Sequence, residues 1–215
     1  MTPPLPSPGS TVFVVDDDPS FRRAIERLLK ASGYAVETFS SAREFLLRLH
    51  WGDRGCVLVD LRMPESSGLE LQTTLSQSQN PLPVIFLTGH GDIPTSVHAM
   101  RGGAEDFLTK PIQKDAVLGA VRRALIRDAG EVVARQKTRD LRQRFQTLTP
   151  REREVMVLVA AGLLNKEIAT SLGTTERTVK AHRASIMDKM RAGSSAELGR
   201  IAQELGLVSP PRAND

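Results

Sequence analysis

Between residues 10 and 128, short hydrophobic runs alternate with segments whose apolar residues recur every three or four positions. The short runs, bounded by Gly, Pro or Asp, are typical of buried strands, and the longer period is typical of amphipathic helices. We expect strands at residues 11–15, 34–39, 57–59, 84–87 and around 107–108, with helices at 19–32, 42–49, 69–75, 93–100 and from 114 onward. Five strand–helix units in this order predict a doubly wound α/β fold with a mostly parallel, five-stranded sheet.

From Leu148 the pattern is entirely helical, with helices expected at 151–161, 165–172, 176–190 and 195–207. Thr149, Pro150 and Glu152 form the sequence signature of a helix start, because a hydroxyl cap, a first-turn Pro and a Glu three residues after the cap occur together. The second and third of these helices are joined by a short turn containing Gly173. This pattern predicts an all-α helix-turn-helix domain whose 176–190 helix enters the major groove of DNA.

The charge is unevenly distributed along the 215 residues. Residues 1–128 carry 14 Lys and Arg against 15 Asp and Glu, residues 129–145 carry 5 against 2, and residues 146–215 carry 10 against 8. A slightly acidic front half and a basic back half favour a polyanion as the partner of the back half. We therefore expect five segments: a disordered tail (1–9), the α/β domain (10–128), a helical linker (129–145), the helix-turn-helix domain (146–208) and a second disordered tail (209–215).

Several classes of protein do not match this composition. The longest run of apolar residues and Gly, at 155–164, is ten residues long, whereas a membrane span needs about 18. The first ten residues, MTPPLPSPGS, lack the basic and apolar regions of a signal peptide. Cys56 is the single cysteine and lies in an expected strand, which excludes an internal disulfide and favours a buried thiol over a nucleophile. We expect a cytoplasmic protein that does not contact membranes.

The residues that follow the expected strands carry a consistent chemistry. Asp16 and Asp17 follow the first strand, Asp60 the third, Thr88 the fourth and Lys110 the fifth. Parallel strands bring their carboxyl ends to one edge of the sheet, so these groups are expected to share a pocket. Strands also end in charged residues simply because they end at solvent, but four such ends in this order are difficult to attribute to chance.

Three clustered carboxylates require a cation, and oxygen ligands without His or Cys suit Mg²⁺. A carboxylate beside this ion can act as a nucleophile toward a phosphoryl group, while Lys110 and a hydroxyl stabilise the charge of the transferred group. The expected chemistry is the formation of an aspartyl phosphate.

The motifs VVDDD (14–18), VDLRMPESSG (59–68), FLTGHGD (86–92) and DFLTKP (106–111) resemble those of the response-regulator receiver domain. The resemblance implies that Asp60 is the phosphoacceptor, that Asp16, Asp17 and the backbone carbonyl of Arg62 place the metal with it, and that Thr88 and Lys110 take part in catalysis. It further implies that Thr88 and Phe107 form the switch that responds to phosphorylation. His90 follows the small residue Gly89. It either influences hydrolysis of the aspartyl phosphate or is a solvent-exposed loop residue.

Residues 148–190 resemble the LuxR-type helix-turn-helix, and the whole chain resembles the NarL/FixJ family of response regulators, with HRA (182–184) and GHGDIP (89–94) favouring the FixJ side. Val179, Ile186 and Met190 form an apolar stripe on the third helix. By the resemblance, Lys180, Ala181 and Ala184 face bases, Ala184 toward a thymine methyl, and Thr178 and Arg183 contact bases or phosphates. His182 is assigned to packing. The last helix pairs two DNA-bound domains in relatives.

The resulting interpretation is a transcription regulator that is switched by phosphorylation and is not a turnover enzyme beyond slow self-dephosphorylation. A sensor histidine kinase would phosphorylate Asp60, the receivers would form a homodimer through residues 93–101 and 105–109, and the dimer would bind promoter DNA and contact RNA polymerase. A coiled-coil stem at 129–145 is the alternative to a plain helical linker. Two other functions stay open: a constitutive DNA-binding protein with a non-switching receiver, and a Mg²⁺-dependent phosphohydrolase.

Overall fold

The computed structural model describes residues 9–50, 52–64, 67–78, 81–89 and 93–208. Of the tails expected to be disordered, 1–9 and 209–215, residues 1–8 and 209–215 lie outside these ranges. His90 also lies outside the described residues, because 90–92 are not described. The chain divides into two compact units, and the boundary in the sequence lies between Val132 and Val133. No helix in the described ranges is both long and apolar enough to cross a membrane.

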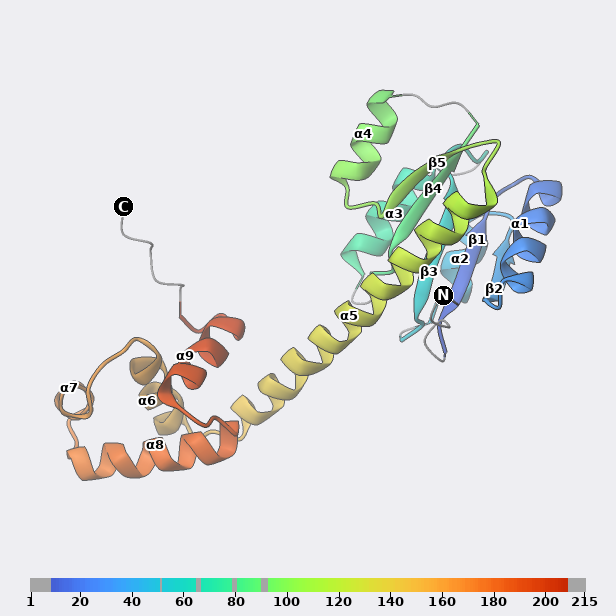
Figure 1. The fold of residues 1–215 in the computed structure, drawn as a ribbon. Coiled ribbons are helices and arrows are strands. Elements are labelled where there is room, and N and C mark those ends of the chain that lie inside the picture. Colours follow the sequence, from blue (N-terminus) through green and yellow to red (C-terminus); the bar gives the residue numbers. More distant parts are fainter. Residues whose placement is uncertain (1–8, 51, 65–66, 79–80, 90–92, 209–215) are drawn as a thin grey trace. The chain divides into compact units, whose positions relative to one another are not determined.

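The first unit is built on one parallel sheet whose strand order is β2-β1-β3-β4-β5 (Figure 1). Its strands are β1 (Thr11–Val15), β2 (Ala35–Phe39), β3 (Gly55–Asp60), β4 (Val84–Thr88) and β5 (Asp106–Thr109). They alternate with α1 (Pro19–Ala31), α2 (Ala42–Arg48), α3 (Gly68–Gln77), α4 (Ile93–Arg101) and α5 (Lys114–Gln146). The predicted doubly wound α/β fold is confirmed. Strand β1 lies between β2 and β3 and pairs in parallel with both.

Alternation along the strands divides the apolar side chains between two hydrophobic cores, one on each face of the sheet. Phe13, Val57 and Phe86 pack under α2, α3 and α4, whereas Val14 and Leu58 pack under α1 and α5. All five side chains are buried. A sheet covered on both faces explains why its central strands are continuous hydrophobic runs rather than half-polar ones.

The second unit is all α-helical. It consists of the end of α5 followed by α6 (Pro150–Ala160), α7 (Asn165–Ser171), α8 (Glu176–Met190) and α9 (Ser195–Glu204). The predicted cap of α6 is present, because Thr149 accepts a hydrogen bond from the amide of Glu152 while the Glu152 carboxylate accepts one from the amide of Thr149. The helix α9 is three residues shorter than expected, since Gly206 adopts a φ of +73° and the Leu207 amide turns back to the carbonyl of Ala202.

The segment expected as a helical linker, 129–145, is part of α5, which is one continuous helix. This helix begins in the first unit, and its last turns belong to the second. Leu141 is buried among the side chains of the second core, and Phe145 packs against the same core. The division between the two units, at Val132 and Val133, falls inside the segment that was expected to be the linker.

Candidate functional site

Four side chains from four strand ends meet at the carboxyl edge of the sheet. Asp16 directly follows β1, Asp60 ends β3, Thr88 ends β4, and Lys110 directly follows β5. The ammonium nitrogen of Lys110 donates hydrogen bonds to Asp16 Oδ2 and to Asp60 Oδ1, each over 2.7 Å. The structure therefore joins two carboxylates and one ammonium that lie 94 and 50 residues apart in the sequence.

Burial gives this cluster its electrostatic character. Asp16 is fully buried and Asp60 keeps only 7% of its surface exposed. Burial raises the pKa of the Asp16 carboxyl, and this effect outweighs the hydrogen bond from Lys110, which lowers it. Burial also lowers the pKa of Lys110, but its hydrogen bonds to Asp16 and Asp60 more than compensate, so its pKa lies above the ordinary value and the ammonium is charged at neutral pH.

The backbone after β3 holds Asp60 from its other side. The amide of Arg62 donates to Asp60 Oδ2 over 2.7 Å, so each oxygen of this carboxylate has one fixed donor. Gly68, at the start of α3, passes close to β3, because a Cβ at this position would lie 2.7 Å from the Asp60 carbonyl oxygen. A side chain at position 68 would push the loop away from the phosphoacceptor candidate.

The three consecutive carboxylates after β1 have separate environments. Asp16 is buried, whereas Asp17 and Asp18 are exposed. Asp18 caps α1 by accepting from the amides of Ser20 and Phe21, and these bonds lower its pKa. Asp18 therefore has a structural role at the helix start. Asp16 accepts from Lys110 and from the Asp18 amide, and Asp17 is exposed beside it.

Two contacts of this strand-end cluster were not predicted from the sequence. Lys110 Nζ lies 4.0 Å from the centroid of the Phe21 ring, and a guanidinium nitrogen of Arg22 donates to the carbonyl oxygen of Asp16. Both residues belong to the first turn of α1. A Phe at the third position after Asp18 indicates only an amphipathic helix, and nothing in the sequence distinguishes its contact with a cation from ordinary packing.

Thr88 and Phe107 lie on neighbouring strands next to the cluster. Asp60 is paired with Leu87 in the sheet register, so Thr88 is one residue further along β4, and it is buried. The Thr88 carbonyl accepts from the amide of Lys110 over 2.6 Å. Phe107 is half-buried, with its ring centroid 6.3 Å from that of Phe86. The edge of the sheet thus connects the cluster to an aromatic side chain on β5.

The second unit exposes one side of α8. The buried side of this helix consists of Val179, Ile186 and Met190, the predicted apolar stripe. Thr178, Lys180, Ala181 and Ala184 are exposed. His182, assigned to packing, is half-buried.

Arg183 differs from the other four candidates because it is held within the protein. Its guanidinium donates to Asn165 Oδ1 over 3.0 Å and to Ser195 Oγ over 2.6 Å, and its side chain is half-buried. Asn165 begins α7 and Ser195 begins α9, so Arg183 connects three helices. A guanidinium has five N–H donors, and these two bonds do not exhaust them.

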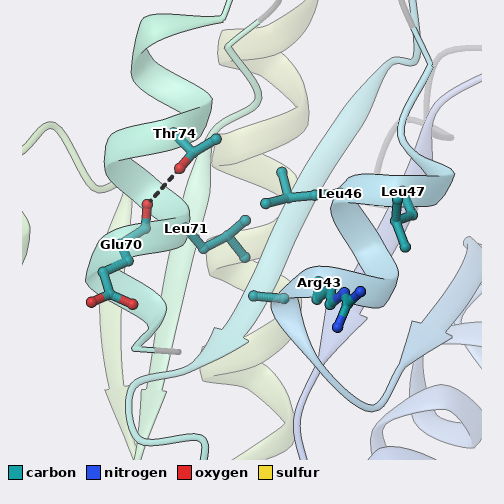
Figure 2. Close-up of a pocket in the computed structure, with 7 residues that line it drawn as sticks. Arg43, Leu46, Leu47, Glu70, Leu71 and Thr74 are labelled. Atoms are coloured by element: carbon teal, nitrogen blue, oxygen red, sulfur yellow. Dashed lines mark hydrogen bonds between the residues drawn. The ribbon is translucent and has the colours of Figure 1, made fainter. Parts of the chain in front are cut away.

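A hollow of about 350 Å³ lies between α2 and α3 (Figure 2). Leu46, Leu47 and Leu71 supply its aliphatic lining, with Arg43 and Glu70 at its edge. The Thr74 hydroxyl donates to the backbone carbonyl of Glu70, which satisfies it within α3. None of the lining residues belongs to the strand-end cluster, and the hollow lacks the paired titratable groups expected of a catalytic site.

Comparison with known proteins identifies both units. Residues 12–122 match the response regulator receiver domain, and residues 146–202 match the bacterial regulatory proteins of the luxR family. A receiver followed by this DNA-binding domain defines a two-component response regulator that regulates transcription. The chain belongs to the NarL/FixJ family of these regulators.

Individual relatives cover nearly the whole chain. The chain is 46% identical to nodulation protein W of Bradyrhizobium diazoefficiens over 94% of its length and 88% of that protein. It is 43% identical to the transcriptional regulatory protein FixJ of Azorhizobium caulinodans, over 92% of this chain and 93% of FixJ. Among solved structures, the response regulator StyR is similar with a TM-score of 0.77 and 43% identity, over 91% of this chain and 99% of StyR.

Proposed function

We propose that Asp60 accepts a phosphoryl group from a sensor histidine kinase. The observation that carries this proposal is the position of Lys110, whose ammonium is bound to both Asp16 and Asp60 and is therefore placed to balance the negative charge of a phosphoryl group. An oxygen of Asp60 forms the new bond to phosphorus. The bond from phosphorus to the histidine nitrogen breaks, its electron pair stays on the imidazole, and that ring takes up a proton.

We further propose a Mg²⁺ site formed by Asp16, Asp17, Asp60 and the backbone carbonyl of Arg62. Receiver domains generally use Mg²⁺ at their phosphorylation site. No three His, Cys, Asp or Glu side chains in the described ranges are arranged as a complete metal site, but Mg²⁺ is usually bound through one or two carboxylates and several waters. The oxygen donors at this edge suit that ion, and bound Mg²⁺ would neutralise charge on the phosphoryl oxygens. Burial of Asp16 beside a second carboxylate supports the need for a cation other than Lys110.

Thr88 and Phe107 are the proposed switch. A phosphoryl group adds about −1.5 to −2 charge and three acceptor oxygens at Asp60. Thr88 carries a hydroxyl that can donate to these oxygens, and it lies one residue beyond Leu87, the register partner of Asp60. Movement of Thr88 toward these oxygens would leave space beside β5 for Phe107. The change would reach the surface of α4 and β5, which we propose as the dimer interface.

We assign the DNA interface to Thr178, Lys180, Ala181, Arg183 and Ala184. The exposure of four of these residues on α8 supports the assignment, and small side chains at 181 and 184 permit close approach to base edges. Arg183, fixed by Asn165 and Ser195, has donors left for a phosphate at the edge of the groove. Binding of a homodimer to two half-sites, contact with RNA polymerase and a cytoplasmic location complete the proposal. The protein acts as a switch rather than as a turnover enzyme.

Replacing the phosphoacceptor tests this function. With acetyl phosphate and Mg²⁺, the wild-type chain should incorporate one phosphoryl group that hydroxylamine removes, and its affinity for promoter DNA should rise. Asp60→Asn keeps the size and the hydrogen-bonding oxygen but lacks the nucleophile, so incorporation and the rise in affinity should both disappear. Equal incorporation by Asp60→Asn would contradict the site assignment. Steady release of phosphate with turnover from small phosphoesters would favour a phosphohydrolase, and affinity independent of the donor would favour constitutive DNA binding.

A further inference from the structure

Arg177 lies on the exposed side of α8, and no role was assigned to it from the sequence. Arg177, Ala181, Ala184 and Asp188 are all exposed, and their spacing of four, three and four residues places them in one row along the helix. This row lies opposite the buried Val179–Ile186–Met190 stripe. Arg177 therefore shares a row with two of the proposed base-facing residues.

The row is asymmetric along the helix. Arg177 is the second residue of α8, which begins at Glu176 and is capped by the Thr175 hydroxyl. Asp188, near the other end, carries a negative charge that repels DNA phosphates. The cationic end of the row thus lies at the helix N-terminus, which is the end of a recognition helix that contacts base edges.

The small side chains in the middle of the row decide what Arg177 can reach. Ala181 and Ala184 are short and exposed, so the backbone of α8 can lie deep in the major groove. A long guanidinium side chain one turn before Ala181 would then extend along the groove floor. By their spacing along α8, Thr178 and Arg183 lie outside the row, one on each side of it.

We propose that Arg177 is a specificity-determining residue that recognises guanine in each half-site of the DNA. Its guanidinium presents two parallel N–H donors that match the O6 and N7 acceptors of guanine in the major groove. Ala181 and Ala184 supply apolar contacts to neighbouring bases, and Arg177 supplies the directional hydrogen bonds that these alanines cannot make. This proposal rests on the proposed DNA interface of α8.

Selection from random duplexes tests it, with the full chain treated with acetyl phosphate. Wild type should select a site with a required guanine in each half, and Arg177→Ala should lose the preference at that position alone. Affinity for the selected site should fall roughly 5- to 150-fold, and affinity for unrelated duplex should change much less. Arg177→Lys, which retains the charge but not the two parallel donors, should keep its affinity for unrelated duplex and retain a weaker guanine preference than wild type. Arg142→Ala, which removes an exposed Arg of the same unit on α5, is the matched control and should select the wild-type site.

Two results would overturn the proposal. One is an unchanged guanine preference in Arg177→Ala. The other is an equal loss of affinity on every duplex, with the slope of log K against log salt smaller by about 1, which marks a phosphate contact instead. Failure of the proposed DNA interface is a separate result, because wild type would then select no sequence with or without acetyl phosphate. Circular dichroism melts of the variants verify folding, which an exposed position should leave intact.

Discussion

Glu152 shows how a single buried carboxylate can organise the second unit. Its side chain is almost completely buried, yet it accepts hydrogen bonds from the Lys189 ammonium over 2.7 and 2.9 Å, from the Ser185 hydroxyl over 2.6 Å and from the Thr149 amide over 2.7 Å. Burial raises the pKa of Glu152, but these four bonds outweigh it and lower the pKa to about 2. The carboxylate joins the start of α6 to the last turns of α8, and the ionised form is the one that the folded state favours.

Replacing this carboxylate with an amide should weaken the second unit in a pH-dependent way. Glu152→Gln should lower the free energy of unfolding by about 1.5–3 kcal/mol at pH 6, since the Lys189 ammonium loses its charged acceptor. Because the folded pKa lies below the unfolded one, the contribution of Glu152 is complete above about pH 4.5 and is lost as the pH falls toward 2.

Denaturant titrations followed by circular dichroism, performed at several pH values between 2 and 6, measure this difference. The gap between wild type and Glu152→Gln should narrow as the pH falls. A gap that stays constant over this range would mean that the charge of Glu152 does not stabilise the fold. Glu154→Gln is the control, because Glu154 is exposed on the same helix and pairs with Arg151 across the surface.

Sequence patterns predicted which residues meet at the sheet edge, but not what surrounds them. Asp16, Asp60 and Lys110 could be brought together before any coordinates, because the ends of parallel strands share one edge. The contact of the Phe21 ring with Lys110 could not be predicted from the sequence, since it depends on the packing of α1 against the sheet. The hydrogen bonds of Arg183 to Asn165 and Ser195 could not be predicted either, because hydrogen bonds between three helices leave no periodic signal in the sequence.

Among the elements, the strands and the start of α5 were predicted closely, whereas the place along α5 at which the chain divides into two units was not. Each strand coincides with a hydrophobic run that ends in a charged or hydroxyl residue, and all five lie at or within two residues of their expected positions. The end of α5 offers no such run, because 135–144 is basic and polar and contains one aliphatic residue, Leu141. Leu141 and Phe145 pack on the second core, and Lys137 and Arg144 add hydrogen bonds to the Glu204 carboxylate and to the Met190 carbonyl. Contacts this few and of such different kinds leave no periodic pattern in the sequence from which the division could be placed.

Truncation of Leu141 tests whether the end of α5 belongs structurally to the second unit. Leu141 is 5% exposed, so Leu141→Ala should leave a cavity and lower the free energy of unfolding of that unit by about 2–5 kcal/mol. Hydrogen exchange measured by mass spectrometry should show lost protection in α6, α8 and α9 but not in the sheet. The exposed neighbour Arg142 provides the control, and Arg142→Ala should have little effect. If Leu141→Ala exchanged like wild type throughout, residues 133–146 would be a linker after all.

For the whole molecule, regulation requires that a charge placed at the sheet edge alters a surface that a second copy can bind. Val97 and Met100 leave 44% and 48% of their surface exposed on successive turns of α4, and with Ser96 and Arg101 they line a hollow of about 440 Å³. An exposed aliphatic pair is costly in water and is typical of an interaction surface. The same helix packs against β5, the strand that carries Phe107, so this surface is one step from the proposed switch.

A charge placed on this surface should separate phosphorylation from assembly. Met100→Glu leaves Asp16, Asp60 and Lys110 untouched, so phosphoryl incorporation should proceed at the wild-type rate. Two copies would, however, bring two buried carboxylates together, and the dimer that forms after treatment with beryllofluoride should weaken at least tenfold, since burying unpaired charge costs several kcal/mol. Light scattering measures the mass of each state over a range of protein concentrations. Leu47→Glu is the matched control, because Leu47 is 79% exposed on α2, outside the proposed interface, and this variant should dimerise like wild type. If Met100→Glu dimerised as well as Leu47→Glu, the α4 surface would not be the interface, and another face of the receiver would have to connect Asp60 to DNA binding.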